Sequence, residues 1–316
     1  MARSFRLRPA RTVLESPVMQ THLPTLRQLR YLVALAEHHH FGRAAEACFA
    51  TQSTLSAGLQ ELETLLGATL VERTKRKVLM TPLGEAVVAR ARDVLRGAED
   101  IADLVRAAGQ PLAGELRLGV IPTIAPFLLP RVLPELRRSY PDLRLVLRED
   151  LTARLLERLA NAELDVALLA LPYDAPDMET LSLAEDPFVL ACPAGHPLAA
   201  RETVTGADLA DADLLLLEEG HCLRDHALAA CALAAPSRRG EDILGTSLGT
   251  LVQMVASGLG VTLLPELAVA GGVLRGTDLV TRPLAGGGAR RLGLAWRKSS
   301  ARKDEFRLLG RTLFPG

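Results

Sequence analysis

Aromatic side chains are scarce in this chain. Its 316 residues include only 7 Phe, 3 Tyr and 1 Trp, so aromatics make up 3% while hydrophobic residues make up 48%. The core must therefore be built mainly from Leu, Ala and Val. A hydrophobic share of this size, with 23% charged residues, is typical of a globular protein with a full core. The length fits about two domains.

Long hydrophobic runs and a net charge are also missing. No apolar run approaches the roughly 18 residues of a membrane span, and residues 1–24 carry arginines but no apolar signal-peptide segment. We therefore expect a cytoplasmic protein with no membrane partner, which excludes a periplasmic solute receptor. The 37 Lys and Arg balance 37 Asp and Glu. Net charge thus predicts no nucleic-acid partner, although residues 1–110 are mildly basic.

Cysteine is rare, with four residues in the whole chain. Cytoplasmic proteins seldom hold structural disulfides, and those that form there are usually transient and redox-active. Cys48 lies in an Ala-rich segment and Cys192 in an apolar one, so we expect both to be structural. Cys222 and Cys231 flank a segment rich in Leu and Ala, residues that favour a helix.

A helix that begins at Cys222 would keep these two thiols apart. Nine residues at 1.5 Å each place Cys231 roughly 13 Å along the helix axis, whereas a disulfide needs Cα atoms closer than about 7 Å. We hypothesise that this mutual exclusion of helix and disulfide is a switch. For two cysteines on such a helix taken alone, burial as small hydrophobes is the simpler interpretation. We expect His226, one turn into the helix, to be an exposed polar residue.

The N-terminal part of the chain predicts a disordered tail (residues 1–24) and a DNA-binding domain (residues 25–81). A helical pattern ends at three consecutive histidines, which point in different directions and so do not form a metal site. A short Ala-rich helix is followed by a second helix that opens with Gln52, Ser53 and Thr54. Two short helices with a tight turn are typical of a helix-turn-helix, although Ser and Thr at a helix start are also ordinary caps.

A basic hairpin follows these helices. Residues 70–73 and 78–80 have strand character, and residues 74–77 form a basic turn between them. Such a hairpin is typical of a wing that contacts DNA phosphates, and a solvated charged turn is the alternative. The predicted DNA-contacting residues are Arg43, Gln52, Ser53, Thr54, Arg73, Lys75, Arg76 and Lys77.

The rest of the chain predicts a linker helix and a two-lobed α/β domain. Residues 82–109 form one long helix whose apolar stripe needs a partner, so we interpret it as a helix that packs against its copy in a dimer. Packing onto its own domain is the alternative. Residues 112–316 alternate strands with helices, which indicates parallel pairing. Lobe I (about 112–187 and 291–316) and lobe II (about 188–290) would enclose a cleft suited to a small molecule.

The order of these parts resembles the LysR-type transcriptional regulators, from about Thr25 to the C-terminus. The resemblance rests on the strings YLVALAEH (31–38), RKVLMTPLG (76–84), IPTIAPFLLP (121–130), EEGHCLRD (218–225) and TSLGTLVQMVASGLGVTLLPELAV (246–269). GHCLRD with a second cysteine nine positions later is a specific signal for hydrogen-peroxide sensors within this family. The expected fold class is α plus α/β, with an N-terminal winged helix-turn-helix, a long linker helix and a two-lobed α/β domain of periplasmic-binding-protein type.

This resemblance implies a DNA-binding regulator of the oxidative-stress response that hydrogen peroxide switches. Cys222 would react with peroxide, and Cys231 would resolve the product as a disulfide. The other sensing residues would be Thr123, Thr152, His221 and Arg297, with Thr246 and Ser247 facing the cleft from lobe II. No cofactor or metal is implied. The implied partners are double-stranded DNA, hydrogen peroxide, further copies of the chain in a homodimer or homotetramer, RNA polymerase and a cellular dithiol reductant.

The implied chemistry begins with a Cys222 thiolate, which peroxide oxidises to a sulfenic acid. The sulfenic acid then condenses with a second thiol to form a disulfide. A helix start, Arg224 or Arg297, and a hydrogen bond from His221 or a threonine would favour the thiolate, while Asp225 would oppose it. The disulfide would unwind the helix and so move the dimer interface.

Two alternatives fit parts of the same pattern. A LysR-type regulator that binds a small organic metabolite between the lobes would need neither cysteine. An enzyme such as a thiol peroxidase is disfavoured, because the chain has no dinucleotide or P-loop fingerprint and an enzyme has no use for residues 41–81. One departure concerns DNA binding. The second helix has no basic residue between Thr51 and Leu66, so phosphate contacts are expected from Arg43, Arg73 and the hairpin turn.

Overall fold

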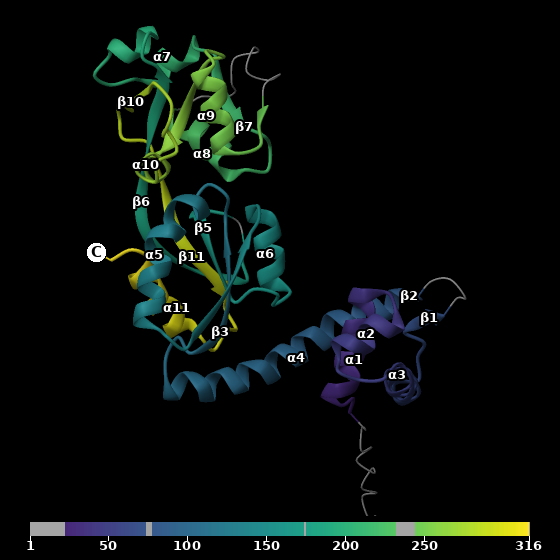
Figure 1. Cartoon of the computed structure of the whole chain (residues 1–316). Helices are drawn as coiled ribbons and strands as arrows, with labels where there is room; N and C mark the ends of the chain where they lie inside the picture. Colours follow the sequence, from purple (N-terminus) through teal and green to yellow (C-terminus); the bar gives the residue numbers. More distant parts are fainter. Residues whose placement is uncertain (1–22, 74–77, 174, 232–243, 316) are drawn as a thin grey trace, which may run out of the picture. The chain divides into compact units, whose positions relative to one another are not determined.

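The computed structural model describes residues 23–73, 78–173, 175–231 and 244–315, and Figure 1 shows them as a ribbon. Nearly all of the predicted N-terminal tail, the tip of the predicted wing and the segment after Cys231 lie outside these residues. The chain divides into two compact units, Met1–Leu95 and Arg96–Gly316. No helix in the described ranges is long and apolar enough to cross a membrane.

Three short helices form the core of the first unit. They are α1 (Leu26–His38), α2 (Phe41–Ala47) and α3 (Gln52–Leu66). Each begins where a side chain accepts hydrogen bonds from the first backbone N–H groups, as Thr25 does for α1 and Thr51 for α3. Apolar side chains from all three helices meet in one buried cluster. The helix-turn-helix part of the predicted fold class is therefore present.

The three consecutive histidines serve as caps in this unit. His39 ends α1 in the left-handed conformation, and the ring Nδ1 of His40 accepts hydrogen bonds from the N–H groups of Gly42 (3.1 Å) and Arg43 (3.3 Å). The run thus ends one helix and starts the next. No cluster of potential metal ligands occurs among the described side chains.

A two-stranded hairpin follows α3 and is tied to it. Strands β1 (Val71–Arg73) and β2 (Val78–Met80) pair antiparallel. The carboxylate of Glu63 on α3 accepts hydrogen bonds from the N–H groups of Leu70 (2.8 Å) and Val71 (3.1 Å). Because one side chain accepts both bonds, it fixes the start of the hairpin against α3. The first unit thus has the form of a winged helix-turn-helix.

Helix α4 (Pro82–Gly109) has 28 residues. Its Val88 and Ala91 are buried, whereas Val94, Ile101 and Val105 are 51%, 67% and 74% exposed. These three exposed side chains belong to the apolar stripe of α4. No described residue of the chain covers this part of the stripe.

The second unit is built on a mixed sheet. Among its described residues the strand order is β4-β3-β5-β11-β6-β9-β7-β8, and β10 also pairs with β6. The strands are β3 (Gly114–Val120), β4 (Leu143–Glu149), β5 (Val166–Leu171), β6 (Met178–Pro193), β7 (Leu214–Leu217), β8 (Leu244–Gly245), β9 (Val261–Pro265), β10 (Leu279–Pro283) and β11 (Ala289–Arg297). The helices are α5 (Ala125–Ser139), α6 (Thr152–Ala160), the 3-10 helix η1 (Pro197–Ala200), α7 (Gly206–Ala210), α8 (Cys222–Ala230), α9 (Leu248–Ala256), α10 (Glu266–Ala270) and α11 (Lys303–Leu313).

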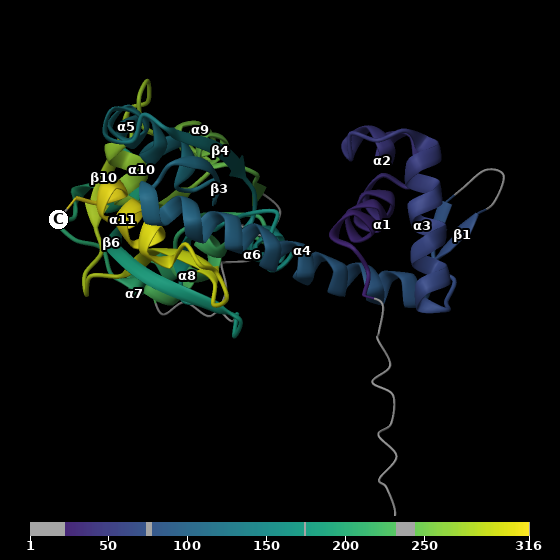
Figure 2. The same ribbon diagram turned by 90° about the horizontal axis from the view of Figure 1, so that it is seen from below.

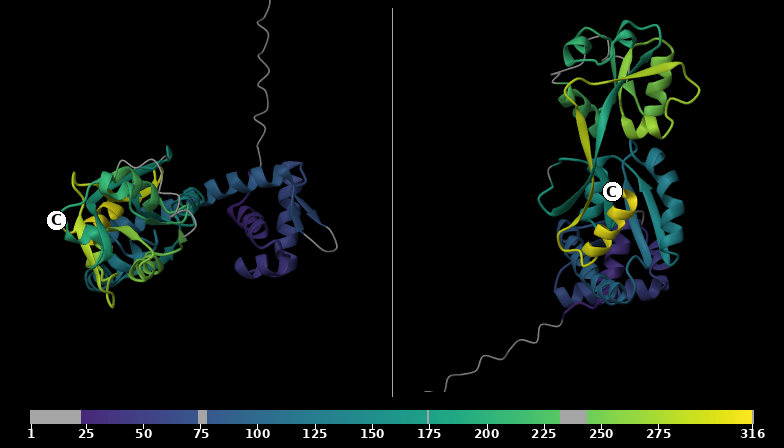
Figure 3. Two further views of the ribbon diagram at one scale, coloured as in Figure 1. Left: turned by 90° about the horizontal axis from the view of Figure 1, so that it is seen from above. Right: turned by 90° about the vertical axis from the view of Figure 1, so that its left-hand side faces the viewer.

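Two strands pass between the lobes of this unit. β6 pairs with β11 along its first part and with β9 and β10 along its last part. Figure 1 and the right-hand view of Figure 3 show β6 and β11 running side by side from one lobe to the other. They are antiparallel, because β6 leaves lobe I and β11 returns to it. The parallel pairing predicted from the alternation of strands and helices is present for β3 and β7 with their neighbours, but it is wrong for β6 and β11, whose pairs are antiparallel.

Each lobe has its own hydrophobic core. In lobe I the rings of Trp296 and Phe306 pack with centroids 5.5 Å apart, and α5 and α11 lie next to each other at its surface (Figure 2). The core of lobe II includes Cys192 at 0% exposure, Leu223 and Ala227. The aliphatic core predicted from the scarcity of aromatics is present in both lobes.

A buried ionic network ties the strands of lobe I to α11. The Asp165 carboxylate accepts hydrogen bonds from the backbone N–H (2.7 Å) and Nη2 (2.8 Å) of Arg117 and lies 3.7 Å from Nη1 of Arg302. Arg302 also pairs with Glu305 at 3.1 Å, and Glu305 accepts the N–H of Leu112 at 3.0 Å. Burial lowers the pKa of Arg117, but the hydrogen bond and charge of Asp165 raise it by more.

We expect Asp165→Asn to lower the free energy of unfolding of lobe I by about 3 kcal/mol, because it removes a buried carboxylate and leaves Arg117 without this ion pair. The single tryptophan, Trp296, lies in this core, so urea unfolding followed by tryptophan fluorescence reports on the lobe. Glu115→Gln is the matched control. It removes an exposed ion pair with Arg144 (3.5 Å) and should cost less than about 1 kcal/mol. Equal losses in both variants would contradict the network.

Candidate functional site

Cys222 and Cys231 lie at opposite ends of helix α8. Cys222 is its first residue and is half-buried, and Cys231 caps its C-terminal end at 8% exposure. Both are free thiols. The N–H of Cys231 donates to the carbonyl of Ala227 at 3.3 Å, so the last turn is intact. The helix predicted between the two cysteines is present, with the separation that a nine-residue helix imposes.

The chain approaches α8 through Gly220 and His221. Gly220 has φ +96, a conformation that favours glycine. His221 is the N-cap residue and is buried. Burial lowers its pKa, and Glu218, whose Oε1 lies 4.0 Å from Nε2, acts in the opposite direction. His221 is therefore neutral at neutral pH. Among the described residues no side chain caps the start of α8, so its first N–H groups face Cys222 as a weak positive pole.

Cys222 lies in a narrow pocket together with most of the predicted sensing residues. The lining residues are Ile121, Pro122, Thr123, Leu151, Thr152, Gly220, His221 and Cys222. They enclose no more than about 170 Å³, less than the 300–1,000 Å³ usual for sites that bind organic ligands. The Oγ1 atom of Thr152 is buried and has no hydrogen-bond partner in the described part of the chain. This hydroxyl is available to a ligand in the pocket.

Arg290 is a further residue of this site, which the sequence did not predict. It is 1% exposed and lies directly opposite Asp186 where β11 pairs with β6. Its Nε donates to Asp186 Oδ2 at 2.9 Å, its Nη1 to Thr123 Oγ1 at 2.8 Å and its Nη2 to the Thr123 carbonyl at 3.1 Å. Asp186 in turn accepts the N–H of Leu267, at the start of α10, at 2.9 Å. The arginine thus joins Thr123 in lobe I to a strand that continues into lobe II.

The charge of Arg290 acts on Cys222. Burial lowers the pKa of Arg290, while Asp186 and the nearby Cys222 raise it. An arginine stays protonated in such surroundings, so a buried positive charge lies within electrostatic reach of the thiol. Because Thr123 Oγ1 already accepts a hydrogen bond from Arg290, its own O–H is left to donate. The pocket therefore offers two hydroxyls to an oxygen-containing ligand beside Cys222, and the buried cation Arg290 is hydrogen-bonded to one of them.

Arg297 does not belong to this site, so that prediction is wrong. Its Nη1 donates to the carbonyls of Leu159 (2.7 Å) and Leu164 (2.6 Å) at the end of α6. It lies seven residues after Arg290 on β11, which is roughly 24 Å along a strand. The apolar pattern in the sequence begins only after Arg290 and so gives no sign of its role. The strand itself starts at Ala289.

Thr246 and Ser247 do not line the pocket at Cys222. Both are exposed, and the Ser247 hydroxyl caps α9 by accepting the N–H of Thr250 at 3.2 Å. Their predicted place on the cleft face of lobe II stays a prediction.

The predicted DNA contacts fall partly within the described residues. Arg43, Gln52, Ser53 and Thr54 are all exposed. The hydroxyls of Ser53 and Thr54 lie 3.0 Å and 2.8 Å from that of Thr51, the N-cap residue of α3. Ser53 and Thr54 thus contact the cap and remain exposed. The side chain of Arg73 and all of Lys75, Arg76 and Lys77 lie outside the described residues.

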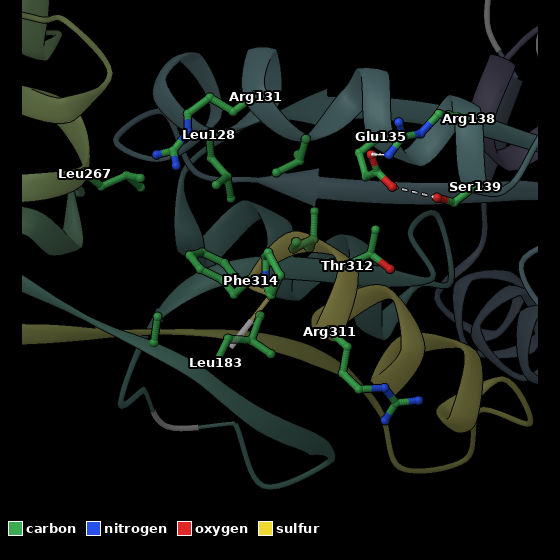
Figure 4. Close-up of a pocket in the computed structure, with 14 residues that line it drawn as sticks. Leu128, Arg131, Glu135, Arg138, Ser139, Leu183, Leu267, Arg311, Thr312 and Phe314 are labelled. Carbon is green, nitrogen blue, oxygen red and sulfur yellow. Dashed lines mark hydrogen bonds and ion pairs between the residues drawn. The ribbon is translucent and has the colours of Figure 1, made fainter.

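A larger groove of about 850 Å³ lies between α5 and α11, away from Cys222 (Figure 4). Its floor includes Leu128 and Phe314, and its Glu135 is held by Arg138 and by a 2.9 Å hydrogen bond from Ser139. None of the predicted sensing residues lines it, so the thiol chemistry belongs to the smaller pocket.

Known proteins share both parts of this architecture. Residues 26–85 match the model for bacterial regulatory helix-turn-helix proteins of the lysR family, and residues 109–313 match the LysR substrate binding domain. The HTH-type transcriptional regulator EstR of Acinetobacter baylyi is 46% identical over 289 residues, 90% of this chain and 94% of that protein. A probable hydrogen peroxide-inducible genes activator of Streptomyces viridosporus is 44% identical over 291 residues, 92% of this chain and 93% of that protein.

The solved structures agree with the sequence matches. Full-length OxyR from Pseudomonas aeruginosa, in a cysteine-to-aspartate form, superposes with a TM-score of 0.78 at 40% identity, covering 92% of this chain and 95% of that one. The predicted fold class and the family resemblance are confirmed. With both domain types, their order and full-length relatives in agreement, the chain belongs to the LysR family of bacterial transcriptional regulators.

Proposed function

We propose that this regulator responds to hydrogen peroxide through oxidation of Cys222 and formation of a Cys222–Cys231 disulfide. The observation that carries the proposal is the pocket at Cys222, where the hydroxyls of Thr123 and Thr152 and the buried cation Arg290 converge beside a free thiol. A relative named as a peroxide-inducible activator and the neighbouring OxyR structure support it. The site would need no metal or cofactor.

The first step is attack of the Cys222 thiolate on one peroxide oxygen. The S–O bond forms as the O–O bond breaks, and the departing hydroxide takes a proton to leave as water. The positive charge of Arg290 and the helix start favour the thiolate. The O–H of Thr123 can donate to the leaving oxygen. Sulfur is oxidised to the sulfenic acid, and peroxide is reduced.

The second step needs Cys231, which is out of reach while α8 is intact. Attack of the Cys231 sulfur on the sulfenic sulfur forms the S–S bond as the S–O bond breaks, and the departing hydroxide takes the proton of the Cys231 thiol to leave as water. Burial raises the pKa of Cys231, so it stays a thiol until the helix end opens. Gly206 packs against this end so closely that a Cβ there would lie 2.1 Å from the Cys231 carbonyl oxygen. Oxidation must therefore displace Cys231 from Gly206.

The regulated function is binding to double-stranded DNA through the first unit, with contacts from α3 and the wing. The exposed stripe of α4 at Val94, Ile101 and Val105 suits packing against a second copy in a dimer or tetramer. Unwinding of α8 would be transmitted to DNA through such an assembly. RNA polymerase would be the downstream partner, and a cellular dithiol would return the disulfide to two thiols.

A regulator of a small organic metabolite is the second candidate, because EstR is a LysR-family relative whose name does not mention peroxide. The narrow pocket at Cys222 is too small for most such ligands. Tight binding of an organic anion without loss of thiols under peroxide would favour this candidate. Many turnovers of peroxide with added reductant would instead indicate a thiol peroxidase.

Stoichiometric peroxide should convert wild type to a form with two fewer free thiols, because one disulfide forms. Intact mass measured with and without peroxide, followed by peptide mapping, should show a Cys222–Cys231 link. Cys222→Ser should lose the response completely, and Cys231→Ser should stop at the sulfenic acid. Cys192→Ser is the control and should respond normally. Cys192 is buried and does not line the pocket at Cys222. A normal response in Cys222→Ser would overturn the proposal.

We expect Arg290→Lys to slow oxidation of Cys222 at least tenfold. A lysine keeps the charge but cannot donate to both Asp186 and Thr123 at once, so the Thr123 hydroxyl loses its fixed orientation. The rate is measured by quenching with a thiol alkylator and mass spectrometry. Arg297→Lys is the control, because this arginine lies on the same strand but donates to carbonyls at the end of α6. It should change the rate less than twofold, and equal rates in the two variants would refute the role of Arg290.

Gly206→Ala should shift the thiol–disulfide equilibrium toward the disulfide by at least tenfold, which is about 30 mV for two electrons. The added methyl group clashes with the Cys231 carbonyl in the dithiol form and destabilises that form. Equilibration in glutathione or dithiothreitol buffers measures the shift. Gly195→Ala is the control, because a Cβ there meets nothing within 4 Å. A shift of equal size in Gly195→Ala would contradict the explanation by a clash with the Cys231 carbonyl.

A further inference from the structure

His226 on α8 is less exposed than the sequence predicts. The sequence favours an exposed residue, but His226 is half-buried, and its Nδ1 atom is buried without a hydrogen-bond partner among the described residues. It lies four residues after Cys222 on α8, and residues at this spacing are neighbours on one helix face. Helical side chains lean toward the N-terminal end. This spacing directs the imidazole toward the turn that begins with Cys222.

The groups around His226 fix its charge. α8 packs against β11 and β7. β11 brings the buried cation Arg290, while β7 consists of four buried leucines (Leu214–Leu217) and brings no charge. On α8 itself the charged residues are Arg224, whose Nη1 donates to the Leu217 carbonyl at 3.4 Å, and the exposed Asp225. Burial and Arg290 lower the pKa of His226 below its ordinary 6.5, and Asp225 acts in the opposite direction. The ring is neutral at neutral pH and can accept a proton.

The unpaired Nδ1 distinguishes His226 from the other histidine at this site. A buried ring nitrogen without a partner costs free energy unless the surroundings supply a donor. The Cys222 thiol is a donor one helical turn away. His221, in contrast, lies on the other side of Cys222 in the chain and has Glu218 at 4.0 Å. Between the two imidazoles, only His226 combines an unpaired buried nitrogen with electrostatic contact to Arg290.

Building on the proposed function, we propose that His226 is the proton-transfer residue of the sensing site. Its neutral imidazole accepts the proton of the Cys222 thiol as the thiolate attacks peroxide. The imidazolium then gives this proton to the departing hydroxide, so that thiol and peroxide yield sulfenic acid and water and the histidine ends neutral again. Arg290 has two effects in this step, because it attracts the thiolate and repels the imidazolium, which drives the proton onward to the leaving oxygen.

The test is the pH dependence of Cys222 oxidation, measured from about pH 5 to about pH 8 by alkylation quench and mass spectrometry. In wild type the rate constant should fall as pH drops through the pKa of His226, with a midpoint below the ordinary 6.5. His226→Gln should lower the rate at neutral pH at least tenfold and remove this midpoint. Asp225→Asn should move the midpoint to lower pH and leave the plateau rate within twofold, because it removes the charge that stabilises the imidazolium.

Two comparisons keep the outcomes separate. His39→Gln, an exposed cap in the DNA-binding unit, should match wild type at every pH. An unchanged midpoint and rate in His226→Gln, or a midpoint that disappears only in His221→Gln, would overturn the inference and leave the peroxide response standing. If wild type itself is not oxidised at Cys222, the proposed function fails instead. Far-UV circular dichroism of each variant identifies a loss of folding.

Discussion

The buried ion pair between Arg290 and Asp186 is the constraint on which the pocket at Cys222 depends. The two residues face each other across the strands that pass between the lobes. Arg290 holds Thr123 of lobe I, and Asp186 holds the backbone of Leu267 next to lobe II. Buried charges are costly unless paired and hydrogen-bonded, so this arrangement resists displacement. It places a fixed positive charge within electrostatic reach of Cys222, and it orients the hydroxyl of Thr123, which lines the same pocket.

Helix α8, between the two cysteines, is short, so little free energy is needed to unfold it. A helix of nine residues is marginal alone, so the stability of α8 comes from packing of its buried Leu223 and Ala227. One end lies in the threonine-lined pocket, and the other is fitted closely against Gly206. The dithiol form therefore has a defined structure that limited packing maintains. Under the proposed function, a covalent bond between the two ends would overcome such packing, and its reduction would let the same side chains restore the helix.

In the winged helix-turn-helix unit, the residues that cap α3 also order the exposed side chains at its start. Thr51 caps α3 and its hydroxyl also lies within hydrogen-bond distance of Ser53 and Thr54, which keeps two exposed polar side chains ordered at the helix start. Glu63 fixes the hairpin through two backbone N–H groups. Because α3 carries no basic residue, its contribution suits base edges more than phosphates. Orientation on the duplex would then come from neighbouring basic residues.

The sequence by itself determined the local features of this protein. Helical spacing, the Thr51 cap and the Cys222–Cys231 interval predicted the winged helix-turn-helix, the α/β lobes and a helix between the thiols, because these depend on residues close in the chain. Only the tertiary structure decided which arginine of β11 reaches the site, since Arg290 meets Asp186 across 104 positions through strand register. The burial of His226 was decided in the same way, by strands that pack against α8. Periodicity along a chain carries no information about which distant strand lies alongside.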